Sequence, residues 1–78
     1  MKPQDRYLKF VRWEEDDQLY VGYCPDLFPW GGVCHAKTEG EAFGVLCQLV
    51  QEEVEELKAA GKPLPPSSTR AMREAVPA

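Results

Sequence analysis

Three cysteines and one histidine are the residues to consider first for a structural zinc site or a Cys–His nucleophile, namely Cys24, Cys34, His35 and Cys47. Structural zinc sites pair cysteines with about two to four residues between them, and no two of these cysteines have that spacing. Cys34 and His35 are adjacent in a segment that reads as a strand, so their side chains are expected on opposite faces. We therefore expect neither a metal site nor a Cys–His nucleophile.

A disulfide between Cys24 and Cys34 remains an alternative, because the two lie on neighbouring predicted strands. An odd number of cysteines at irregular spacing is, however, typical of a reduced cytosolic protein, in which all three would be small buried hydrophobes. No apolar run approaches the ~20 residues of a membrane span, and the N-terminus lacks the apolar stretch of a signal peptide. We expect a cytoplasmic protein that does not enter a membrane.

Carboxylates are the other groups with possible chemistry. Paired-carboxylate or two-metal catalysis needs acids that converge from different elements into a cleft. Here the acids gather in a predicted turn at residues 14–18 and along a predicted helix. Asp26 is the exception, but directly after Pro25 it more simply caps its own turn. No glycine-rich phosphate loop is present, so we expect neither an enzyme nor a cofactor.

The charge is distributed unevenly along the 78 residues, whose net charge is −4. Residues 1–37 carry six acidic and five basic groups, residues 38–61 carry six and one, and residues 62–78 carry one and three. This balance counts against a nucleic-acid binder, which needs clustered Lys and Arg. The acidic helix suits a basic partner, with a merely solvated helix face as the alternative.

Three strands and one helix are predicted to position these groups. Residues 6–13 and 19–24 are rich in aromatic and β-branched types and flank the polar turn, which makes them a hairpin. Residues 33–36 form a short third strand, antiparallel to the second. With the helix that follows, the fold class is α+β: a two-layer βββα domain with a three-stranded antiparallel sheet and one long amphipathic helix on one face.

The helix has the clearest local signals and is predicted over residues 38–60. Thr38 and Glu41 form a capping-box pattern, in which Thr38 accepts from the Glu41 amide and the Glu41 side chain reaches back to Thr38. Gly61 stands where a left-handed C-cap occurs, and Pro63 prevents continuation. The residues at helical spacing for a buried face are Ala42, Leu46, Leu49, Val50, Val54 and Leu57.

The remaining segments are a loop and a tail. Pro25 cannot donate to a sheet ladder, so the loop at residues 25–32 begins there. Its two large aromatics, Phe28 and Trp30, either fold back onto the sheet or remain exposed to bind a partner. We assign residues 1–66 to the domain and residues 67–78 to a C-terminal tail. The tail contains at most a short helix at 69–75, frayed or docked.

The order of these motifs resembles the HicB-type antitoxin domain over about residues 7–66. That family has a hairpin ending in Pro-Asp-Leu-Pro-Gly-Cys, a helix start Gly-Asp-Thr-x-x-Glu-Ala and a helix end Gly-x-Pro-x-Pro. The matching residues here are Pro25-Asp26-Leu27, Thr38, Glu41-Ala42 and Gly61-Lys62-Pro63-Leu64-Pro65. The chain departs from the pattern at Phe28-Pro29-Trp30-Gly31-Gly32-Val33-Cys34 and at Ala36-Lys37.

The resemblance implies a partial ribonuclease-H-like fold without nuclease acids. It also implies a partner, a small basic HicA-type ribonuclease toxin that is neutralised by occlusion. Typical members continue into a fourth strand and a DNA-binding domain. This sequence has only about twelve residues after Pro66, so we expect no direct DNA binding. The alternative is a stand-alone homo-oligomeric scaffold or small-ligand binder with no toxin.

Two interaction surfaces follow from these expectations. A chain this short buries only about 60% of its unfolded surface, so a homodimer or higher homo-oligomer is expected. The toxin-binding surface is expected on the acidic helix face, with Trp30 as its apolar anchor. The residues of this predicted protein-binding surface are Phe28, Trp30, Glu52, Glu53, Glu55 and Glu56.

Overall fold

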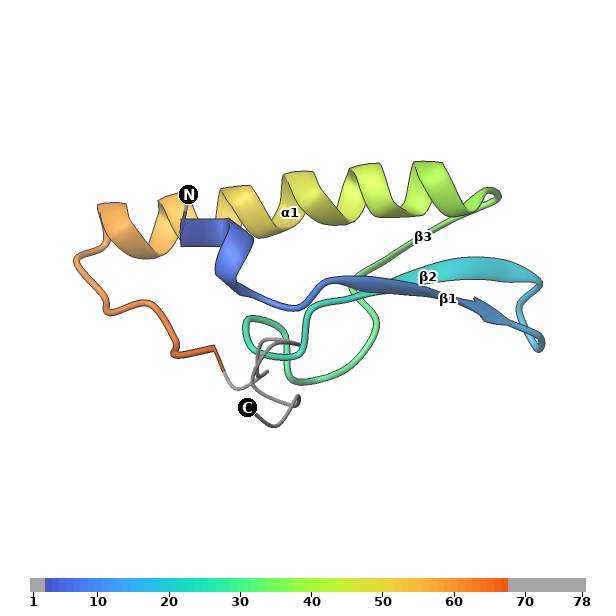
Figure 1. Ribbon diagram of the computed structural model, residues 1–78, viewed down its shortest axis with the longest axis horizontal. Helices are drawn as coiled ribbons and strands as arrows, with labels where there is room; N and C mark the ends of the chain where they lie inside the picture. The colour runs from blue at the N-terminus through green and yellow to red at the C-terminus, as the bar shows by residue number, and fades with distance from the viewer. Residues whose placement is uncertain (1–2, 68–78) are drawn as a thin grey trace, which may run out of the picture.

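The computed structural model describes residues 3–67 and arranges them in two layers, a small sheet and one long helix (Figure 1). The short helix predicted at residues 69–75 lies outside the described residues. In chain order the elements are the 3₁₀ turn η1 (Pro3–Arg6), strands β1 (Phe10–Glu14), β2 (Leu19–Tyr23) and β3 (Cys34–Ala36), and helix α1 (Glu39–Ala59).

The sheet is antiparallel throughout and has the order β1-β2-β3, so the predicted βββα arrangement is confirmed. Gly22 on the central strand β2 stands opposite Val11 on β1 and Cys34 on β3. A side chain at Gly22 would place its Cβ 3.2 Å from the Cβ of Leu46 on α1. This rung of the sheet therefore faces the helix, and the absent side chain allows the two layers to approach closely.

The first strand begins later than predicted. The segment 6–13 was expected to be extended throughout, but regular pairing starts at Phe10 and continues to Glu14. The reason is Tyr7, which is buried with 3% of its surface exposed and whose hydroxyl donates to the carbonyl of Pro65. Tyr7 is drawn away from the sheet to the far end of α1, so the residues before Phe10 leave the β ladder.

The core lies between the sheet and one stripe of α1. Leu46, Val50 and Val54 are 0–2% exposed and belong to the apolar spacing predicted for the buried face. Because α1 has 21 residues, it is about 31 Å long and extends past the strands (Figure 1). Its projecting end is underlain by other chain segments, which contribute Tyr7, Cys24, Leu27 and Phe28 to the core, and the partly buried Leu64 packs against them.

The start of α1 is capped by Thr38 and Glu41, as predicted, but one of the two hydrogen bonds between them differs from the prediction. The Glu41 amide donates to the Thr38 hydroxyl oxygen at 3.2 Å, as expected for the N-cap. The Thr38 hydroxyl in turn donates to a carboxylate oxygen of Glu41 at 3.0 Å. The Glu41 side chain thus closes the box through the Thr38 hydroxyl and not through its backbone amide. Acidic Glu39 and Glu41 also complement the helix dipole there.

The end of α1 is a Schellman motif centred on Gly61. Gly61 has φ +72°, its amide donates to the Lys58 carbonyl at 3.1 Å, and the Lys62 amide donates to the Leu57 carbonyl at 2.9 Å. These two bonds satisfy carbonyls that the last turn would leave unpaired. The predicted left-handed C-cap is confirmed.

Two glycines, one inside α1 and one just past its end, should respond to alanine substitution with opposite changes in stability. Gly61→Ala should lower the free energy of unfolding by about 1 kcal/mol, because alanine strains a left-handed backbone. Gly44→Ala should raise it by about 0.5–1 kcal/mol, because Gly44 lies inside the helix with open space around it. Urea unfolding of the two variants measures both changes. Equal shifts would contradict the assignment of Gly61 as the cap.

Candidate functional site: a groove between the helix and the aromatic loop

A groove of about 320 Å³ runs between the second half of α1 and the loop that joins β2 to β3. One wall is aromatic and comes from the loop, the other wall is acidic and comes from α1, and apolar side chains form the floor. The lining residues are Phe28, Trp30, Gly32, Val33, Leu49, Glu52, Glu53 and Glu56.

The aromatic wall is held by a tight turn after β2. The carbonyl of Cys24 accepts from the amides of Leu27 at 3.2 Å and Phe28 at 2.8 Å, which turns the chain back beneath the helix. Leu27 and Phe28 are consequently buried in the core. Pro25 is exposed at the start of this turn, and Asp26 is half-buried beside it.

Each of the two loop aromatics follows one of the alternatives left open by the sequence, burial or exposure. Phe28 folds back and is 8% exposed, whereas Trp30 is 74% exposed. Their rings meet edge to face, with centroids 5.5 Å apart and planes at 74°. The buried ring therefore supports the exposed one, and the indole is presented to solvent on a fixed base.

The acidic wall consists of Glu52, Glu53 and Glu56, which lie within a little more than one helical turn. Glu52 accepts from the Gln48 side chain at 3.3 Å. Within the described residues, none of the three carboxylates forms an ion pair. Lys62 shares a neighbouring hollow with Glu53 and Glu56 but does not line the groove itself.

Five of the six residues predicted for the protein-binding surface thus line one groove. The sixth, Glu55, lies elsewhere on the helix, where it accepts from the Gln51 side chain at 3.2 Å. Helical spacing explains the difference. Leu49, Glu52 and Glu56 recur every three or four residues and share a flank, whereas Glu55 is about 100° away from Glu56 around the axis.

The groove also has apolar members that the sequence analysis did not assign to it, namely Leu49, Val33 and Gly32. Leu49 was predicted as part of the buried stripe, and it is half-buried at the edge of that stripe. Its spacing from Glu52 and Glu56 was the signal that could have placed it in the groove. The position of Val33 and Gly32 depends on the path of the loop, which no local pattern specifies.

The cysteines and the histidine do not form a site. Cys24, Cys34 and Cys47 are free thiols, so the Cys24–Cys34 disulfide is absent. Burial raises the pKa of the Cys24 thiol and of the Cys34 thiol, which keeps both protonated at neutral pH. In the described part of the chain no group of three or more His, Cys, Asp or Glu side chains could hold a metal ion, and His35 is exposed.

These observations define an α+β domain with an open groove whose walls are aromatic and acidic. Comparisons of the chain with known protein families, with curated proteins and with solved structures find no match. Within the described residues no helix combines the length and the apolar character needed to cross a membrane.

Proposed function

We propose that this chain is a HicB-like antitoxin domain that captures a small basic HicA-type ribonuclease toxin and blocks it by occlusion. The observation that carries the proposal is the groove, in which an exposed indole stands opposite three carboxylates that form no ion pair within residues 3–67. A surface that binds RNA phosphates is rich in Lys and Arg, and such a surface is attracted to this wall. The free thiols support the proposed cytoplasmic location.

The chemistry of the groove suits an arginine- or lysine-rich surface in two ways. The carboxylates of Glu52, Glu53 and Glu56 accept charge-assisted hydrogen bonds, which are stronger than neutral ones. The indole of Trp30 offers a face for a cation–π contact and a large apolar area, and such residues are frequent binding hot spots. Occupation of the groove by basic residues of the toxin would remove them from contact with RNA.

A charge-reversal experiment tests the proposal. Glu52→Lys combined with Glu56→Lys should weaken capture of a HicA-type toxin by on the order of 10- to 100-fold and flatten its salt dependence, because two attractive contacts become repulsive. Isothermal titration calorimetry at two salt concentrations gives both quantities. The toxin to use is one encoded directly beside this gene, if such a gene exists.

The matched control reverses the same amount of charge outside the groove. Glu55→Lys combined with Asp16→Lys changes the net charge equally, but neither residue lines the groove. It should weaken binding less than the first pair does. Equal losses would show that only overall charge matters, and unchanged affinity in both variants would refute the proposed interface. A chain that binds no such toxin would favour the scaffold or small-ligand function instead.

A further inference from the structure

The outer edge of β1 has no neighbouring strand among the described residues. β1 ends the strand order of the sheet, so within residues 3–67 only β2 pairs with it. Its five residues, Phe10–Glu14, contain no proline and no glycine, and they pair with β2 without interruption. Such an edge presents a row of backbone donors and acceptors to any further strand.

The opposite edge of the sheet is built differently. β3 has only three residues, follows the Gly31-Gly32 pair and is succeeded by Lys37. A very short edge strand with a nearby lysine is a common protection against pairing with another chain. Charged residues accompany both edges, so the two differ in length, and β1 offers the longer row of backbone groups.

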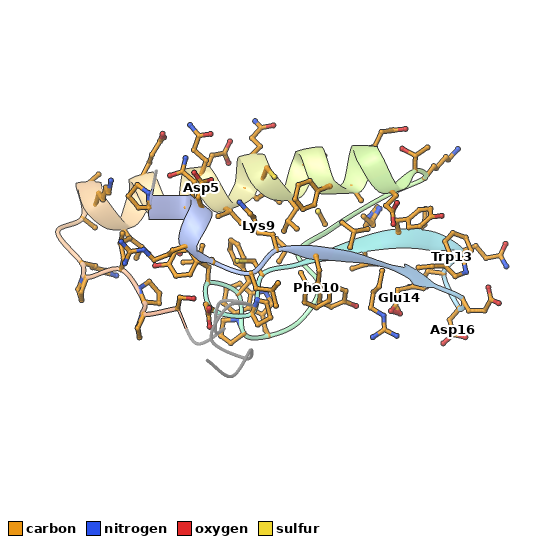
Figure 2. All side chains as sticks on the ribbon, in the orientation of Figure 1. Asp5, Lys9, Phe10, Trp13, Glu14 and Asp16 are labelled. Carbon is orange, nitrogen blue, oxygen red and sulfur yellow. The ribbon has the colours of Figure 1, made fainter. Side chains whose placement is uncertain are left out.

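Apolar side chains are exposed on both sides of the β1 edge. Leu8 is 41% exposed, Phe10 is 37% and Trp13 is 42%, and these are half of the large apolar residues exposed in the described part of the chain. Phe10 and Glu14 lie on the face of the sheet away from α1 (Figure 2), where the Phe10 ring stacks on Tyr23 at 5.0 Å. An added strand would cover this apolar surface together with the backbone edge.

We propose that β1 pairs antiparallel with β1 of a second copy of this chain, forming a six-stranded sheet with both helices on the same face. A two-fold axis perpendicular to the sheet produces this arrangement. Residues that stand opposite each other on the two β1 strands must then point to the same face of the sheet. Because side chains along β1 alternate between the two faces, only a few pairing registers meet this condition.

The charges on the outer face favour one of these registers. Arg12 and Glu14 both lie on that face, where their side chains are 3.4 Å apart, and Arg12 is 65% exposed. An axis through Arg12 would set two guanidinium groups opposite each other, which is unfavourable across a strand pair. An axis through Trp13 sets Arg12 opposite Glu14 of the second copy twice and brings the two indoles together.

This arrangement leaves both acidic grooves accessible. Each groove is lined by Gly32 and Val33, which precede β3, and therefore lies on the β3 side of its sheet. In the pair these sides are the two outer ends of the six-stranded sheet. The dimer would thus present two separate grooves that share no residues with the β1 interface.

Charge-swap variants test the pairing. Arg12→Glu should weaken dimerisation by on the order of 10- to 100-fold in sedimentation equilibrium, because each of two symmetric pairs changes from attraction to repulsion. Glu14→Arg should weaken it similarly. A mixture of the two variants should form a heterodimer in native mass spectrometry, because each pair then joins opposite charges.

A control pair carries the same charge changes outside β1, namely Lys37→Glu and Glu55→Lys. These variants should dimerise as the wild-type chain does, and their mixture should show no preference for the heterodimer. The proposal would be overturned if the wild-type chain were still a monomer at 100 times the protein concentration used in the sedimentation experiment. It would also be overturned by a dimer that both β1 variants leave unchanged, or by β1 amides that are protected from hydrogen exchange in a monomer.

Discussion

Leu46→Ala is expected to leave the chain largely unfolded at 25 °C. Leu46 is fully buried at the middle of α1, and its Cβ and Cδ2 lie 3.2 and 3.3 Å from the position that a Cβ on Gly22 would occupy. Truncation leaves a cavity in the core between helix and sheet, at a cost of about 2–5 kcal/mol. A core of this size supplies about 3–5 kcal/mol in total, so the loss is comparable to the whole stability.

The neighbouring residue on the helix provides a control. Val45 is also apolar but is 42% exposed, so Val45→Ala should change the free energy of unfolding by less than about 1 kcal/mol. Urea titrations followed by far-ultraviolet circular dichroism measure both variants. If Leu46→Ala kept its helical signal and its urea midpoint, the buried stripe would have been assigned to the wrong side of α1.

The helix was predictable because its signals are local. Thr38, Glu41 and Gly61 each act through bonds to residues within about one turn, so their spacing alone locates both ends of α1. The prediction of residues 38–60 agrees with a helix over Glu39–Ala59 flanked by its two caps. The same locality explains why the hairpin was found, since β1 and β2 are joined by a short turn.

The start of β1 was not predictable for the opposite reason. Tyr7 has strand-like neighbours in sequence, but its partner, the carbonyl of Pro65, is 58 residues away along the chain. The fates of Phe28 and Trp30 were undecidable in the same way. Both are large aromatics in one loop, and which ring reaches the core depends on the path of the turn after Cys24, where the Leu27 and Phe28 amides donate to the Cys24 carbonyl.

The groove combines both situations. Its acidic wall was predicted as a run of glutamates, and the helical period separates Glu55 from the other three. Its floor depends on the approach of the loop to Leu49, which is a tertiary contact. The sequence therefore indicated the residues of the two walls, while the shape of the groove required the fold.

Tyr7 joins the two ends of the described chain, so its removal is also expected to destabilise the domain strongly. Tyr7→Ala should destabilise the domain by about 3–5 kcal/mol, since it removes a buried ring and its hydrogen bond together. Tyr7→Phe keeps the ring and should cost only about 1 kcal/mol. In urea titrations at pH 7, Tyr7→Phe should keep an unfolding transition with a lower midpoint, whereas Tyr7→Ala should lose most of it, which separates packing from hydrogen bonding. Equal losses would show that the hydroxyl alone matters.

The hydroxyl of Tyr7 also predicts an alkaline signature. Burial raises the pKa of Tyr7 above its ordinary value, and nearby Arg6 offsets this only in part. The folded chain therefore holds this proton more tightly than the unfolded chain, whose tyrosines titrate near pH ~10. The stabilisation is fully present below that pH and is lost as the pH rises through the folded value.

The comparison of wild-type and Tyr7→Phe chains isolates that titration, because the raised pKa values of Cys24 and Cys34 are common to both. The wild-type chain should be more stable by about 1 kcal/mol at pH 7, and its advantage should shrink as the pH rises above ~10. Urea midpoints measured from pH 7 to 11 follow the difference. A constant difference over that range would mean that the Tyr7 hydroxyl is hydrated in the folded chain, and that the packing of the ring alone secures this end of the domain.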